Sequence, residues 1–101
     1  MSPIDDGHAI HHSELKRGTP VYSSEETVVG TVVESLDNYR ENIFDGLVIE
    51  LENGRRCFVD APEVARTAER AVTLTISAAE AADLPDPPRS SLLSRFRGRG
   101  G

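Results

Sequence analysis

The chain has 101 residues, of which 38% are hydrophobic, and a formal net charge of −6 at pH 7. This length fits one modest domain with a single core. The longest apolar stretches cover only a few residues, whereas a membrane-spanning helix needs roughly 20, and the start MSPIDDGHAIHH lacks the apolar segment of a secretory signal. We therefore expect a cytoplasmic protein.

The charges are distributed unevenly along the chain. Residues 89–101 contain four Arg residues and no acid, so this tail carries +4 and the remaining 88 residues carry −10. Phosphate binding requires clustered Lys and Arg residues, so the acidic body disfavours broad nucleic-acid binding. The tail is the exception.

The N-terminal residues 1–17 lack sustained periodicity, which predicts a flexible arm with a short ordered approach at residues 10–15. After this arm, short β-branched runs alternate with turn signals, as is typical of an all-β sandwich or barrel. Residues 19–22 and 27–36 are predicted strands joined by a polar turn. Gly30 in the second strand indicates a bulge, a bend or a close backbone approach in a curved sheet.

A third strand is predicted at residues 44–52, where side chains alternate between two faces. One face has Leu47, Ile49 and Leu51, and the other has Val48, Glu50 and Glu52. We interpret the two glutamates as a solvated surface that protects a sheet edge. Asn53-Gly54 then predicts a hairpin to a strand at residues 55–60, because Asn-Gly suits the two positive-φ positions of a type I′ turn.

The rest of the predicted domain contains one more strand and a short helix. Residues 61–64 should turn the chain away from the sheet, and the segment up to Arg70 is predicted as a connecting loop or a single helical turn. Residues 72–76 alternate as a last strand. Ser77-Ala78-Ala79-Glu80 has the spacing of a capping box, which predicts a helix through Asp83, and the prolines that follow end it.

A metal site is suggested only weakly by three histidines. His8, His11 and His12 follow Asp5 and Asp6, and these residue types bind Zn²⁺, Ni²⁺ or Cu²⁺. A functional site gathers its ligands on a rigid scaffold, whereas these residues are on a predicted mobile arm. We therefore expect adventitious binding and no metal or other cofactor.

Catalytic chemistry is not supported by any residue pattern. A nucleophile needs a base beside it, but every histidine is in the arm, and the only thiol, Cys57, lies in an apolar alternation that predicts a buried side chain. The glycines are scattered and form no phosphate-binding loop. We expect no enzymatic activity and no small-molecule substrate.

The basic tail carries the candidate partner-binding residues. Leu92, Leu93 and Phe96 fall at helical spacing, and the charged candidates are Arg95, Arg97 and Arg99. Such a segment could fold on an anionic membrane surface, in the groove of a protein partner, or on RNA. The alternative interpretation is a disordered, solubilising terminus.

The strand pattern resembles a PRC-barrel domain, the small β-barrel of the photosynthetic reaction-centre H subunit and of a ribosome-maturation factor. The residues that carry the resemblance are Gly18-Thr19-Pro20-Val21-Tyr22, Val29-Gly30-Thr31-Val32-Val33, Asp45-Gly46-Leu47-Val48-Ile49, Arg56-Cys57-Phe58-Val59-Asp60-Ala61-Pro62-Glu63-Val64 and Ala71-Val72-Thr73-Leu74. One departure is Ser24-Glu25-Glu26-Thr27, which stands where family members commonly have Asp-Gly, so the first hairpin turn is expected to differ.

The resemblance implies a fold and a class of function. The fold is mainly β, a small barrel of about five to six strands with a short C-terminal helix, covering residues 18–84 between the arm, 1–17, and the tail, 85–101. The family has no common catalytic residue, and its members act as docking modules. We therefore expect a protein-interaction or adaptor module, with homodimerisation through a strand edge as one form. RNA or ribosome association through the tail is the alternative, and a small enzyme is the third class.

Overall fold

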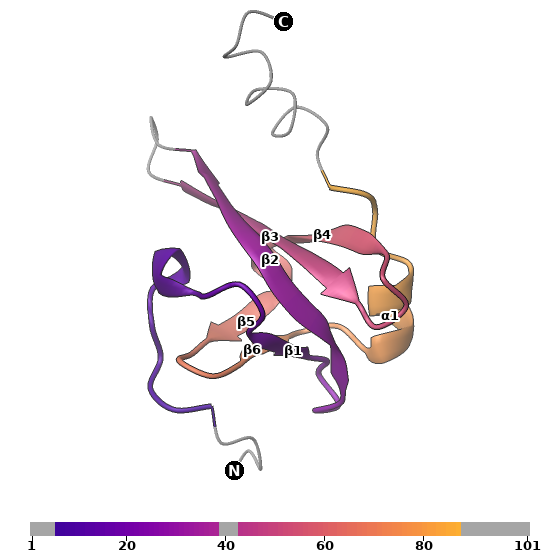
Figure 1. Cartoon of the computed structure of the whole chain (residues 1–101), viewed down its shortest axis with the longest axis horizontal. Helices are drawn as coiled ribbons and strands as arrows, with labels where there is room; N and C mark the ends of the chain where they lie inside the picture. The colour runs from indigo at the N-terminus through magenta and orange to yellow at the C-terminus, as the bar shows by residue number, and fades with distance from the viewer. Residues whose placement is uncertain (1–5, 39–42, 88–101) are drawn as a thin grey trace, which may run out of the picture.

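The computed structural model describes residues 6–38 and 43–87, which form one six-stranded sheet and a short α-helix. The strands are β1 (Pro20–Tyr22), β2 (Val28–Asn38), β3 (Ile43–Leu51), β4 (Arg56–Asp60), β5 (Val64–Thr67) and β6 (Val72–Leu74). Their order is β4-β3-β2-β1-β6-β5; only β1 and β6 pair in parallel. The mixed sheet curls into a half-barrel (Figure 1). The predicted mainly β fold with a short C-terminal helix is confirmed.

The β1–β2 hairpin is closed by a three-residue turn. The N–H of Ser23 donates to the carbonyl of Thr27, and the N–H of Glu26 donates to the carbonyl of Ser23. Glu26 has φ +66, the left-handed conformation that glycine adopts most easily. The polar turn was predicted from the sequence, and a glutamate holds the position where a glycine is favoured.

The β2–β3 pair is the longest ladder of the sheet, and it requires a glycine at position 30. A Cβ added to Gly30 would lie 2.2 Å from the carbonyl oxygen of Glu50, so no larger residue fits against β3. The close backbone approach predicted for this glycine is confirmed. A bulge at Val33 and another irregularity near Asp37 bend the pair, which helps the sheet to curl.

The β3–β4 hairpin forms where it was predicted, but its turn is of another type. The Leu51 N–H donates to the carbonyl of Arg55, and the Gly54 N–H donates to the carbonyl of Leu51. The loop therefore has three residues, and only Gly54, with φ +90, has a positive φ. The predicted two-residue type I′ turn is wrong; the pattern is a turn followed by a left-handed glycine. Asn53 instead accepts the N–H of Arg55 at 2.9 Å.

The segment after β4 contains a strand that the sequence analysis did not predict. A 3-10 turn, η2 (Ala61–Glu63), lies where the chain was predicted to turn away from the sheet. The connecting loop or single helical turn predicted for the segment up to Arg70 is wrong, because β5 lies there and pairs with β6. β6 ends at Leu74, earlier than predicted. Ala68 and Ala71 close the connection through one backbone hydrogen bond. Glu69 and Arg70 therefore form the two-residue turn of a β5–β6 hairpin, which the sequence analysis did not predict.

The helix α1 (Ala78–Ala82) starts with the predicted capping box. The Ser77 hydroxyl accepts the N–H of Glu80, and the Glu80 carboxylate accepts the N–H of Ser77. At the other end, the guanidinium of Arg55 donates to the carbonyls of Ala82 and Leu84. These bonds satisfy carbonyl groups that a helix end leaves unpaired. No helix of the described residues is long and apolar enough to span a membrane.

The core lies inside the curl of the sheet and is closed by α1. Leu47, Ile49, Cys57 and Val59 are fully buried there, and Ala81 of the helix packs among them. The predicted inward face of β3 and the buried thiol are therefore confirmed. Val48, on the other face of β3, is also buried, with 3% of its surface exposed, although it does not belong to this core.

Both edges of the sheet are covered by segments from the ends of the described chain. On the β4 edge, the Phe58 N–H donates to the carbonyl of Pro85 at 2.8 Å. On the β5 edge, the Ile10 N–H donates to the carbonyl of Thr67 at 3.0 Å, and Ala9 forms an antiparallel bridge with Ala68. The sequence predicted an ordered approach at residues 10–15. The backbone pairing of the arm with the β5 edge begins earlier, at Ala9.

Candidate partner-binding surfaces

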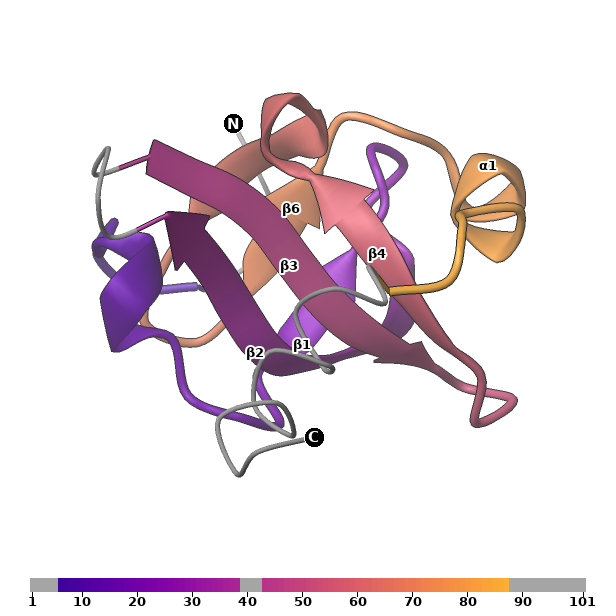
Figure 2. The ribbon, with the colours of Figure 1, turned by 90° about the horizontal axis from the view of Figure 1, so that it is seen from above.

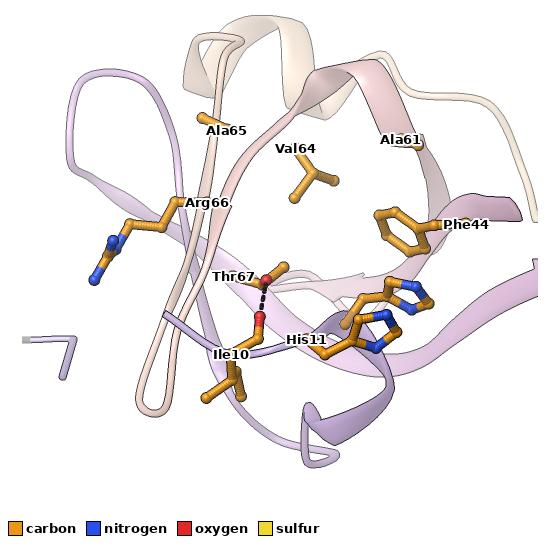
Figure 3. A pocket seen from close by; sticks show the side chains of 9 residues that line it. Ile10, His11, Phe44, Ala61, Val64, Ala65, Arg66 and Thr67 are labelled. Carbon is orange, nitrogen blue, oxygen red and sulfur yellow. Dashed lines mark hydrogen bonds between the residues drawn. The ribbon is translucent and has the colours of Figure 1, made fainter. Parts of the chain in front are cut away.

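A shallow groove lies between the N-terminal arm and β5, and the arm builds one of its walls. The arm continues from Ile10 into the 3-10 turn η1 (His12–Glu14), in which the Ser13 N–H donates to Nδ1 of His11. The Thr67 hydroxyl donates to the carbonyl of Ile10 at 2.6 Å (Figure 3). These bonds fix the arm at a set distance from the strand.

The lining of this groove is mostly aliphatic and aromatic. It has a volume of about 300 Å³, the lower end of the range for small-molecule sites. We call it the β5 groove, and its lining residues are Ile10, His11, His12, Phe44, Ala61, Val64, Ala65, Arg66 and Thr67. Phe44 comes from the start of β3, so the groove joins the arm, η2 and two strands that are distant in sequence.

Three rings stack at one end of the groove. The His12 and Phe44 rings lie 4.1 Å apart between centroids, at 15° to each other, and the His11 and His12 rings lie 4.0 Å apart at 35°. Phe44 and Val64 also pack against the core. This wall is therefore rigid and apolar, with polar ring edges, and it is suited to hold an apolar side chain of a partner.

The opposite end of the groove is held by an ion pair. Arg66 donates from Nε to the Asp6 carboxylate at 2.7 Å and also to the carbonyl of Gly7 at 2.9 Å. Hydrogen bonding to Arg66 holds the pKa of Asp6 below its ordinary value. The guanidinium points away from the stacked rings (Figure 3). Arg66 therefore anchors the arm and leaves the aliphatic centre of the groove uncharged.

A second hollow, of about 340 Å³, lies between the β3–β4 turn, the start of β2 and α1. Val28 contributes to it and is the exposed large hydrophobic residue of the described chain, with 39% of its surface exposed. The rest of the lining is small or polar, and it includes Glu52 and Asn53 of the turn. This hollow has fewer large apolar side chains than the β5 groove.

The three histidines proposed as weak metal candidates are not gathered at one point. His11 and His12 stack in the β5 groove, whereas His8 lies at the β5–β6 turn, where it exchanges two hydrogen bonds with Glu69. Among residues 6–38 and 43–87, no group of three or more His, Cys, Asp or Glu side chains is placed to hold a metal ion.

The other residues singled out in the sequence lie in separate parts of the chain. The tail candidates Leu92, Leu93, Arg95, Phe96, Arg97 and Arg99 lie outside the described residues. Cys57 is fully buried, and burial raises the pKa of its thiol. Glu50 pairs with Arg56 at 3.3 Å, while Glu52 lies in the hairpin turn, so the two glutamates do not share a strand face.

Sequence reasoning missed the groove because it missed β5 and the pairing of the arm. One signal was present: Val64 and Thr67 are β-branched, and two charged residues separate Ala68 from Ala71, as in a short hairpin. The contribution of Phe44 had no such signal, since it depends on where η1 stacks in three dimensions.

Comparison with known proteins does not assign the chain to a family. No protein-family model matches the chain, and no curated protein matches it.

Proposed function

We propose that this protein is a non-catalytic interaction module that holds an apolar side chain of a protein partner in the β5 groove. The observation that supports the proposal best is the wall of stacked rings from His11, His12 and Phe44 beside the aliphatic side chains of β5. A rigid apolar pocket with polar edges is the usual form of an energetic hot spot in protein interfaces.

The resemblance to PRC-barrel domains supports the same proposal, because members of that family act as docking modules. The charge of the body is a further argument: an acidic surface selects protein partners with basic rims over nucleic acids. RNA association through the tail remains the alternative prediction, and it depends on residues outside the described part of the chain.

The proposal is tested by affinity capture from the native cytoplasm, where we expect the protein to act, followed by identification of retained proteins and RNA. Ala65→Arg places a long charged side chain in the groove from an exposed position, and Ala79→Arg makes the same change on the exposed face of α1. We expect a protein that the wild type and Ala79→Arg retain and that Ala65→Arg loses. Retention by all three, or by none, contradicts the proposal, and retention of RNA alone favours the alternative.

A further inference from the structure

The outer face of β2, β3 and β4 carries an apolar strip that the core does not explain. The register places Leu36 opposite Gly46 and Val48 opposite Phe58, so these residues share the face turned away from the core. Leu36, Val48 and Phe58 are absent from the core cluster; Leu36 and Phe58 are half-buried, and Val48 has 3% of its surface exposed. We call these three residues the outer strip. Figure 2 looks onto this face, with β1 and β6 behind it.

A glycine shapes this strip. A Cβ at Gly46 would lie 2.7 Å from Cζ of Phe58, so the Phe58 ring extends from β4 over this glycine of β3. A larger residue at position 46 would displace the ring. The strip spans three strands, and an extended or helical segment can lie over it.

Acidic side chains surround the outer strip. Glu50 and Asp60 lie on the same face by register, and Arg56, which is opposite Glu50, pairs with it at 3.3 Å. These three described side chains together carry a charge of −1. A segment that combines apolar side chains with arginines is complementary to this face.

The chain itself delivers such a segment to this face. The carbonyl of Pro85 accepts the N–H of Phe58, and Arg55 holds Asp86 at 3.3 Å, so the described chain ends at Pro87 beside β4. The next 14 residues, 88–101, contain Leu92, Leu93 and Phe96, four arginines and no acid.

The length of this tail is sufficient to reach across the face. Leu92 follows Pro87 by five residues, which span at most roughly 17 Å, whereas β2 lies about 10 Å from β4 across two strand spacings. A short tether also gives a local concentration of about 1 mM, so a contact with a dissociation constant of about 0.1 mM is about nine-tenths occupied.

We propose that the C-terminal tail binds back onto the outer strip of its own molecule. Leu92, Leu93 and Phe96 cover the half-buried side chains of the strip, Leu36 and Phe58, and the arginines contact the acids around it. The contact withdraws the tail from proteins, membranes and RNA until it is displaced. It is separate from the β5 groove and does not depend on the function proposed for that groove.

Backbone ¹⁵N relaxation of the full chain tests this docking. In the wild type, the amides of residues 92–96 are expected to have order parameters approaching the value of about 0.85 found in rigid strands. Phe96→Asp removes an apolar side chain and adds an acid, and it lowers these order parameters below about 0.6, the range of flexible chain. It also shifts the amide signals of Val48 and Phe58.

Ser94→Asp is the matched control, because it adds the same charge to the tail and removes no apolar side chain; it should leave the Val48 and Phe58 signals near their wild-type positions. All these substitutions are in the tail, so the core is unchanged. Order parameters below about 0.6 in the wild type, or unshifted Val48 and Phe58 signals in Phe96→Asp, overturn the proposal. Loss of order on dilution overturns it too, since the tail then binds a second copy.

Two additions separate docking from external ligands. Vesicles of phosphatidylserine and phosphatidylcholine are added to one sample, and single-stranded RNA to another. If residues 92–96 become ordered only after one of these additions, an anionic surface is the binding partner and the proposal is wrong. If they are ordered beforehand, intramolecular docking is supported.

Discussion

At the scale of single residues, Glu26 has a conformation that its side chain does not favour. Its φ of +66 costs an L-residue about 1–2 kcal/mol relative to glycine. Glu26→Gly and Glu26→Ala remove the same carboxylate, but only the first removes the backbone strain. We expect the Gly variant to be more stable than the Ala variant by about 1 kcal/mol in urea unfolding. Equal stabilities would mean that the turn does not hold this conformation in solution.

The thiol of Cys57 is a second residue-scale test. It is fully buried, and burial raises its pKa, so little thiolate forms near neutral pH and a reagent has no access to it. We expect no reaction with a thiol reagent at pH 7 in the native protein, and complete reaction in denaturant. Fast labelling of the native chain would show that β4 opens often.

The role of a single residue could be predicted from the sequence where it depends on residues a few positions away in the chain. The Ser77–Glu80 capping box needs only residues three positions apart, and Gly30 and Cys57 are set by the strand pattern around them. Asn53-Gly54 was misread because the number of loop residues depends on how β3 and β4 pair, and that register is fixed by the core.

At the scale of elements, the N-terminal arm is held to β5 by a charge-assisted contact. Arg66 lowers the pKa of Asp6 in the folded state, so the contribution of this pair is fully present above the unfolded value of about 3.9 and is lost as pH falls through the lowered value. We expect the Arg70 amide, which donates to the carbonyl of Asp6, to shift as the pH falls below about 4.

Two variants isolate this effect. Asp6→Asn removes the titrating group, so the Arg70 amide should lose the acid-dependent shift while the arm is loosened at neutral pH as well. Asp83→Asn changes an exposed acid at the far end of α1 and should leave the shift unchanged. A persistent shift in Asp6→Asn would assign the titration to another group.

The clasp at the end of α1 is a second element-scale prediction. Arg55 donates to the carbonyls of Ala82 and Leu84 and pairs with Asp86, which ties the C-terminal segment to the β3–β4 turn. Arg55→Ala should lower the free energy of unfolding by about 1–2 kcal/mol, because the two carbonyls lose their donors. Arg55→Lys should recover only part of this, since a lysine lacks the forked geometry. If Arg55→Lys had the same free energy of unfolding as the wild type, the charge at position 55 and not its forked hydrogen bonding would stabilise this contact.

Strongly patterned elements were predictable and weakly patterned ones were not. Alternating Val, Ile and Leu side chains identify β2 and β3, whereas β5 is a four-residue strand with two exposed residues in its middle. Short strands of this kind are stabilised by their neighbours rather than by their own pattern. The arm has even less local signal, so the groove it builds was visible only in the structure.

At the scale of the whole molecule, the half-barrel leaves two open edges, and each end of the described chain covers one. Uncovered edges present backbone groups that pair with other chains. Ile10→Pro removes the N–H that donates to the carbonyl of Thr67 and should uncover part of β5. We expect sedimentation velocity to show a monomeric wild type and a variant that self-associates as its concentration rises.

Lys16→Pro is the control, because it introduces a proline into the arm outside the β5 contact. Leu15, the residue before it, already has the extended backbone that a following proline requires, so this variant should stay monomeric. A wild type that dimerises, or an Ile10→Pro variant that does not, would show that the arm does not protect this edge.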